Sequence, residues 1–163
     1  MLKINKATIP FENFLSEVSP DYKSFAEEIN SSLLANGCQS KIEQKASGYF
    51  VSYTCSKTKR SLLNFLFRKS GLIARIYGEN CKSYSEFLNS IPSTMEKEIS
   101  KATDCKRLID PSKCNQKCTM GYEFKVGNNH YQKCKNSCFM FLITPESMPI
   151  VGNFIKYELK ARQ

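Results

Sequence analysis

The chain has 163 residues, of which 41% are hydrophobic and 12% aromatic, enough for one sizeable core in a single domain. A domain of this size needs neither a metal nor a disulfide merely to fold. The formal net charge of +9 is divided almost evenly, with +4 in residues 1–80 and +5 in residues 81–163, so charge alone does not point to a nucleic-acid or membrane ligand.

Neither an export signal nor a membrane span is expected. Met1–Lys6 carries two lysines but lacks the apolar run of roughly 7 to 15 residues that an export signal requires. The longest unbroken apolar run, Phe139–Ile143, is far shorter than the ~20 residues that cross a bilayer. We therefore expect a cytoplasmic protein. In that reducing compartment, metal binding, catalysis or burial explains eight cysteines better than four structural disulfides.

The first forty residues are typical of two helices. Apolar residues between Phe11 and Val18 fall at helical spacing. Ser19-Pro20 then provides an N-cap and a first helical residue for a second helix. The buried side of that helix repeats every four residues, at Phe25, Ile29 and Leu33. Asn36-Gly37 tolerates positive φ and ends the helix.

Residues 41–78 predict an antiparallel meander. Side chains from Tyr49 to Ser56 alternate with the period of two expected for a half-buried strand. Leu62–Phe67 and Leu72–Tyr77 are two further apolar, partly β-branched segments joined by a turn.

Helices and a hairpin are expected in the C-terminal half. Two capping boxes predict that a helix begins at each of two serines. They are formed by Ser83 with Glu86 and by Ser93 with Glu96. After Cys105 the periodicity is lost, which indicates a loop. Alternation from Tyr122 to Val126, followed by Gly127-Asn128-Asn129, predicts a hairpin.

Phe139–Ile143 is apolar at every position and predicts a central strand. Thr144-Pro145-Glu146 then caps a final helix. Its apolar stripe is Met148, Val151, Ile155 and Leu159, with Lys156, Lys160 and Arg162 toward its negative end. These elements predict an α+β fold for a single domain, residues 1–163. N-terminal helices and a C-terminal helix would pack on an antiparallel sheet. A cysteine-rich hairpin segment at 105–138 would lie between the meander and the C-terminal helix in the sequence.

Two matched cysteine couplets bracket the predicted hairpin. A structural zinc site needs four thiolates about 2.3 Å from one ion, and the hairpin's own pairing brings its two ends together. The i, i+4 spacing within each couplet is wider than in most zinc knuckles and suits one helical turn or a wider loop. We predict a structural zinc ion held by Cys114, Cys118, Cys134 and Cys138, with Cys105 and His130 as reserve ligands.

Other chemistry remains open for the same cysteines. They would form two disulfides in an oxidising compartment, or remain buried free thiols. Four thiolates are also the usual ligands of an iron–sulfur cluster, and close thiols can act as a redox switch. The remaining cysteines, Cys38, Cys55 and Cys81, are interpreted as small buried or incidental residues.

Basic residues gather around the couplets. Their simplest role is to compensate the −2 charge of a zinc–tetrathiolate centre. The more specific hypothesis is that these residues form an anion-binding face. Nucleic-acid bases would then stack on Tyr122, Phe124 and Tyr131 if these rings are exposed. The candidate anion-binding residues are Lys106, Arg107, Lys113, Lys117, Lys133 and Lys135.

No catalytic motif is recognisable in the sequence. It lacks a phosphate-binding Gly-rich loop, a dinucleotide fingerprint, an H-E-x-x-H helix motif and a nucleophile elbow. The couplets also have the wrong interval for a zinc deaminase. The sequence therefore favours a non-catalytic protein.

The chain resembles small bacterial α+β proteins of clostridial type with twin C-x-x-x-C motifs. The resemblance is carried by Phe65–Lys69 before Gly71–Tyr77, and by Tyr131–Phe139 before a terminal helix. The resemblance covers most of the chain and implies no established activity. We expect a small zinc-binding adaptor or binding module whose partner is an acidic protein or nucleic acid. The alternatives are a redox or iron–sulfur protein using the same cysteines, and a nucleic-acid-binding module using the basic surface.

Overall fold

The computed structural model describes residues 7–163 and has the expected α+β fold. The expectation for Met1–Lys6 concerns residues outside this range. The helices are α1 (Phe11–Glu17), α2 (Pro20–Ala35), α3 (Ser85–Asn89), α4 (Ser93–Lys101), α5 (Lys106–Ile109) and α6 (Ser147–Ala161), with a 3₁₀ turn η1 (Cys81–Tyr84). The strands are β1 (Cys38–Lys45), β2 (Gly48–Cys55), β3 (Ser61–Arg68), β4 (Gly71–Ile76), β5 (Tyr122–Val126), β6 (Asn129–Lys133) and β7 (Met140–Leu142).

The main sheet is antiparallel, with strand order β1-β2-β3-β4-β7. Its first four strands form the predicted meander, which begins one strand earlier than the alternation at Tyr49 indicated. The prediction of a central strand at Phe139–Ile143 is wrong: β7 is a short edge strand that pairs only with β4 among the described residues. It is apolar because the core covers one of its faces and a groove beside α4 lies on the other.

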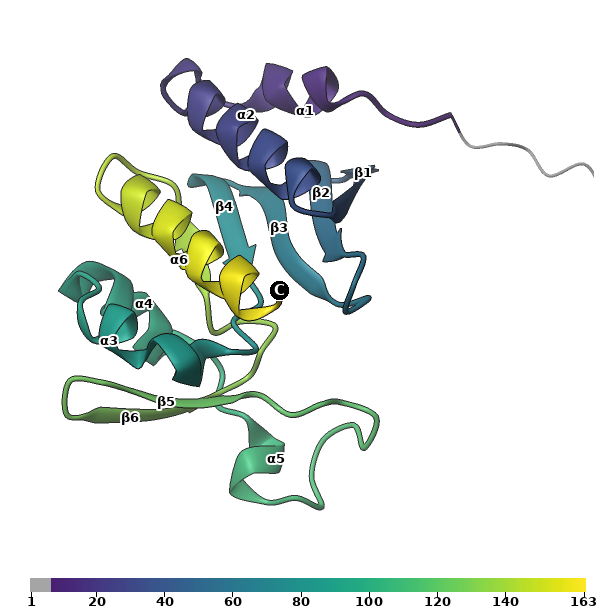
Figure 1. Ribbon diagram of the computed structural model, residues 1–163. Helices are drawn as coiled ribbons and strands as arrows, with labels where there is room; N and C mark the ends of the chain where they lie inside the picture. The colour runs from purple at the N-terminus through teal and green to yellow at the C-terminus, as the bar shows by residue number, and fades with distance from the viewer. Residues whose placement is uncertain (1–6) are drawn as a thin grey trace, which may run out of the picture.

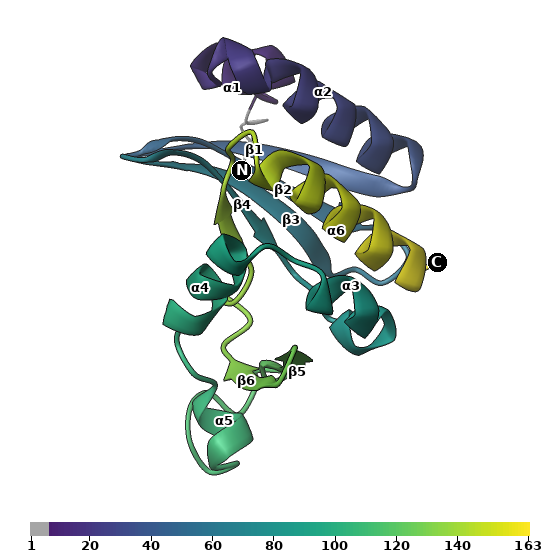
Figure 2. The ribbon, with the colours of Figure 1, turned by 90° about the vertical axis from the view of Figure 1, so that its left-hand side faces the viewer.

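One face of the main sheet carries the core. Phe65, Ala74 and Phe141 are register partners on β3, β4 and β7, so their side chains share this face. Phe14 of α1 stacks on Phe65, with ring centroids 5.7 Å apart, and Phe154 of α6 packs against Phe141. Figure 2 shows α1, α2 and α6 on this side of the sheet. The N-terminal and C-terminal helices therefore cover a single face, as predicted.

The opposite face of the sheet is less covered. Leu66, Ile73 and Leu142 form a cross-strand apolar row on it. Toward β1 and β2 this face meets solvent, since Lys41 is exposed and Phe50 only half-buried. The sheet therefore has one face in the core and one face partly open.

Neither predicted capping box forms, although α4 begins at Ser93 as predicted and α3 begins two residues after Ser83. Ser83 lies inside η1, and its hydroxyl donates to the Asn80 carbonyl (2.7 Å). Pro92, not Ser93, is the N-cap of α4. Glu96 accepts hydrogen bonds from Asn129 Nδ2 (2.8 Å) and the Tyr131 hydroxyl (2.9 Å). The hairpin thus takes the carboxylate that the local motif would have used.

A buried ionic network fixes the end of α6. Glu158 is 0% exposed and accepts from Arg162 Nε (2.9 Å), Asn80 Nδ2 (3.0 Å) and the Tyr84 hydroxyl. Arg162 also donates to the carbonyls of Ser61 (2.9 Å) and Tyr77 (2.7 Å). Such a pair is tolerated in a core only when its remaining donors and acceptors are satisfied. Arg162 therefore turns into the protein instead of facing solvent at the helix end.

The hairpin β5–β6 lies below α3 and α4, and the loop that carries α5 extends beyond it, at the opposite end of the molecule from α1 and α2 (Figure 1). Tyr122 and Phe124 turn inward and pack on Phe139, which connects the hairpin to the main core. Across residues 7–163, we find no helix with the length and apolar character needed to span a membrane.

Candidate functional site

Two of the candidate ligands, Cys105 and Cys134, flank the base of the hairpin. The Cys105 amide donates to the Gln132 carbonyl (2.9 Å), and the Cys134 amide donates to the Thr103 carbonyl (2.8 Å). An isolated antiparallel bridge between Asp104 and Lys133 lies between these bonds. Because side chains alternate across such a bridge, Cys105 and Cys134 lie on the same face. A reserve ligand thus lies diagonally across the bridge from a predicted one.

Gly121 joins the first couplet to the hairpin at this point. Its amide donates to Cys105 Sγ (3.3 Å). A Cβ at Gly121 would collide with the Lys133 carbonyl oxygen and approach Cys105 Cβ to 2.9 Å. Only glycine therefore allows the chain after Cys118 to pass this close to Cys105.

The first couplet lies in a loop with little packing. Cys114 is exposed and Cys118 is partly exposed. Arg107 donates to the Cys118 carbonyl, which closes the loop on itself. Between residues 106 and 121 no side chain is buried, and Ile109 is 64% exposed. This segment is held by hydrogen bonds and by its attachment to the fold at its two ends, and not by a hydrophobic core.

Cys138 is the most buried of the four predicted ligands. Residues 134–138 form a turn in which the Cys138 amide donates to the Cys134 carbonyl (2.9 Å). The Cys138 thiol is 1% exposed and belongs to the hydrophobic core. Burial, with Cys81 nearby, raises its pKa well above the usual thiol value. This sulfur therefore resembles a core thiol more than a loop ligand.

His130 is near the turn of the hairpin, where it pairs with Lys125. Its Nε2 lies 3.5 Å from a Glu123 carboxylate oxygen. The couplets lie at the other end of the two strands. Within residues 7–163, no group of three or more His, Cys, Asp or Glu side chains is arranged to hold a metal ion.

The predicted basic residues have different environments. Lys133 is 6% exposed, and its ammonium group donates to Ser100 O (3.0 Å), Ala102 O (2.9 Å) and Asp104 Oδ1 (2.8 Å). Its three donors are satisfied within the protein, so it has none left for an anion. Lys106, Lys113 and Lys117 are exposed on the loop, whereas Lys135 donates to Thr119 (2.9 Å) and Arg107 is used inside the loop.

The aromatic residues of the hairpin offer little surface for stacking. Tyr122 and Phe124 are only 5% and 6% exposed. Tyr131 is half-buried, and its hydroxyl donates to Glu96. Binding of single-stranded nucleic acid by this hairpin would require exposed aromatic rings on which bases can stack. Tyr122 and Phe124 are too buried to serve in this way.

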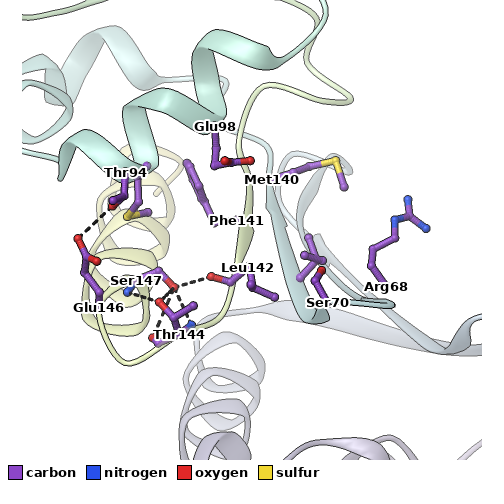
Figure 3. Close-up of a pocket in the computed structure, with 12 residues that line it drawn as sticks. Arg68, Ser70, Thr94, Glu98, Met140, Phe141, Leu142, Thr144, Glu146 and Ser147 are labelled. Carbon is purple, nitrogen blue, oxygen red and sulfur yellow. Dashed lines mark hydrogen bonds between the residues drawn. The ribbon is translucent and has the colours of Figure 1, made fainter.

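An open groove lies on the other side of α4. It encloses about 470 Å³ between α4, the edge strand β7 and the start of α6. Ile73, Met140 and Leu142 provide its apolar lining, while Arg68 stands at the far rim from Glu146 (Figure 3).

Most polar groups in this groove have partners in the fold. Thr94 donates to Glu146 (3.0 Å), and Ser147 donates to the Leu142 carbonyl (2.6 Å). The Ser147 amide also donates to Thr144 Oγ1 (3.1 Å), which confirms the predicted cap of α6. Ser147 therefore fixes the start of a helix.

A close pair of thiols, Cys38 and Cys55, was not anticipated from the sequence. Their sulfur atoms are 3.8 Å apart on neighbouring strands. Strand β1 is largely polar, so no period-two alternation of apolar residues marks it or gives its register with β2.

The buried ion pair of Glu158 and Arg162 was also not predicted. Their i, i+4 spacing was a signal for pairing, but an exposed pair would have the same spacing.

Comparison with protein-family models, curated proteins and solved structures finds no match to this chain.

Proposed function

We propose that the protein is a cytoplasmic, non-catalytic binding module whose loop 105–121 is held by a structural zinc ion and contacts an acidic partner. The observation that carries the proposal is the absence of any buried side chain from residues 106–121. Long irregular loops in compact domains are usually either functional or disordered, and packing does not hold this one in place. Metal coordination supplies cross-links of the kind that burial does not provide here.

Four cysteines are available to such an ion near the hairpin base. Cys105 and Cys134 share one face of the bridge, and the loop between Cys114 and Cys118 returns to Cys105 through Gly121. Cys138 is buried in the core. We therefore propose Cys105, Cys114, Cys118 and Cys134 as the ligands, so that the reserve ligand replaces Cys138.

A zinc ion with four cysteine ligands has no open position for water or substrate, which is why the proposed role is structural. The loop would then act through its surface. It carries Lys106, Arg107, Lys113 and Lys117 against Asp110. An acidic protein is favoured over nucleic acid because the neighbouring aromatic rings, Tyr122 and Phe124, are buried.

Metal analysis tests the zinc proposal. Full-length protein purified under reducing conditions without chelator is expected to contain about one zinc ion per chain. Cys105→Ser and Cys118→Ser should lose it, whereas Cys138→Ser and the distant Cys38→Ser should keep it. Loss from Cys138→Ser but not from Cys105→Ser would restore the two-couplet ligand set. Iron with visible absorbance would indicate a cluster instead.

Binding measurements test the partner class. Poly-glutamate and a single-stranded DNA oligonucleotide of similar charge are titrated against the protein at two salt concentrations. The double variant Lys113→Glu/Lys117→Glu should lose poly-glutamate binding, and the charge-matched control Lys156→Glu/Lys160→Glu on α6 should retain it. Tighter binding of DNA at equal salt, with a steep salt dependence, would favour the nucleic-acid alternative.

A further inference from the structure

Cys38 and Cys55 are direct partners at the end of the β1–β2 ladder. Their sulfur atoms lie 3.8 Å apart, and both residues are 5% exposed. A free thiol is common in a core, but two thiols in contact on adjacent strands are positioned to form a disulfide with each other.

The backbone around this pair suits a disulfide. The Ser56 amide donates to the Gly37 carbonyl (3.0 Å), one residue beyond the pair on each strand. That bond places Cys38 and Cys55 at a non-hydrogen-bonded position, where opposite Cα atoms are typically about 4.5 Å apart and side chains are closest. A disulfide accepts Cα separations of about 4.4 to 6.8 Å. Rotation of the side chains alone would therefore join the sulfurs.

The two sulfurs have different surroundings. Arg162 Nη1 lies 3.7 Å from Cys55 Sγ, so a guanidinium cation stands beside this sulfur and stabilises negative charge on it. Burial and the neighbouring Cys55 together raise the pKa of the Cys38 thiol to about 12, so Cys38 keeps its proton at neutral pH. This asymmetry fits one attacking and one resolving cysteine.

We propose that Cys38 and Cys55 form a redox site at which a small peroxide drives reversible formation of a cross-strand disulfide. The Cys55 thiolate attacks one peroxide oxygen, the O–O bond breaks, and Cys55 becomes a sulfenic acid while hydroxide leaves. The proton that Cys55 released on forming the thiolate neutralises this hydroxide. Cys38 sulfur then displaces the hydroxyl group from Cys55, and the Cys38 proton leaves with that hydroxyl as water. Two thiols lose two electrons and two protons in total, and one hydrogen peroxide becomes two waters.

The position of the pair gives it access and reversibility. Hydrogen peroxide is little larger than water, and the pair lies next to the exposed residues Gly37 and Lys57 at the sheet end. A small dithiol restores both cysteines by thiol–disulfide exchange. In a reducing compartment such a bond would be transient, which is typical of redox-sensing disulfides and not of structural ones.

Peptide mapping of the full-length protein tests the proposal. Reduced protein is exposed to stoichiometric hydrogen peroxide, free thiols are alkylated, and linked peptides are identified by mass spectrometry without reductant. We expect the Cys38–Cys55 link to form before any other, in wild type and in the control Cys81→Ser alike, and to disappear with dithiothreitol. Recovery of Cys38 and Cys55 as separately alkylated, unlinked thiols after treatment with excess hydrogen peroxide would overturn the proposal.

A second measurement separates the two cysteines. In Cys38→Ser the resolving thiol is missing, so a sulfenic-acid probe such as dimedone should label Cys55. In Cys55→Ser the probe should leave Cys38 unlabelled. Equal labelling in the two variants would contradict the assigned roles, and the wild-type map remains valid even if either variant is unstable. None of these readouts depends on zinc or on the proposed partner.

Discussion

The sheet with its helices and the loop 106–121 are stabilised in different ways. In the sheet region, Phe14, Phe65 and Phe154 are fully buried, Phe14 stacks on Phe65, and Phe154 packs against Phe141. In the loop no side chain is buried, and the only regular element is the short helix α5. The difference shows that apolar packing holds the first region, whereas hydrogen bonds such as that from Arg107 to the Cys118 carbonyl hold the second.

The largest expected effect comes from a core ring. Phe65→Ala removes a ring that contacts both Phe14 and Tyr53, and should lower the free energy of unfolding by about 3–5 kcal/mol. Ile109→Ala in the loop should change it by less than about 0.5 kcal/mol. Urea denaturation measures both values. Similar costs at the two positions would abolish the contrast between the regions.

The next effect tests the ionic network beneath α6. Arg162→Met leaves Glu158 buried without its cation and should cost about 3 kcal/mol or more in unfolding free energy. The double variant Glu158→Leu/Arg162→Met should recover part of that loss, because it removes both charges. Lys160→Met on the exposed side of α6 is the control. A single Arg162 variant as stable as this control would mean that the pair is not essential.

Alkaline pH should weaken the sheet region through its buried thiols. Burial, aided by the charge of Glu158, raises the pKa of Cys81 to about 12 from an ordinary value near 9. Between these values the unfolded chain loses the thiol proton while the folded chain keeps it, so stability falls as pH rises from about 9 to 12. Under reducing conditions Cys81→Ala should show a shallower decline. Cys114→Ala, at an exposed position, should decline as wild type does.

The smallest effect on global stability is expected from metal removal. If zinc holds the loop, a chelator should change the unfolding free energy of the sheet region by less than about 1 kcal/mol, because the core makes no use of the ion. It should nevertheless open Lys113 and Lys117 to trypsin, which samples local opening. Limited proteolysis with mass spectrometry reads this out. Cleavage that does not respond to the chelator would contradict a metal-held loop.

Much of the fold was predictable because periodicity reports burial. Phe25, Ile29 and Leu33 mark one side of α2, and Tyr49–Cys55 alternates as β2. Strand β1 escaped prediction because it is a polar edge strand, stabilised by pairing with β2 and not by apolar alternation of its own. Local patterns could not foresee that partners from the hairpin would take Glu96 away from its capping box.

The candidate site was predictable only in part. Spacing identified two couplets at the ends of a hairpin, which is where the structure has them. It could not show that Cys138 turns into the core. Nor could it show that Cys105 and Cys134 share a face, because that depends on a bridge between Asp104 and Lys133. The Cys38–Cys55 contact likewise depends on strand register, which a polar strand does not encode in its own sequence.

Gly121 limits how this molecule can be altered. The obstacle at that position is a backbone carbonyl, which cannot rotate away as a side chain would. A saturation library at residue 121, sorted for folded protein, should therefore return glycine alone, whether the cells are starved of zinc or supplied with it. Designers who wish to graft new sequences onto this loop should keep position 121 fixed and vary the exposed positions before it.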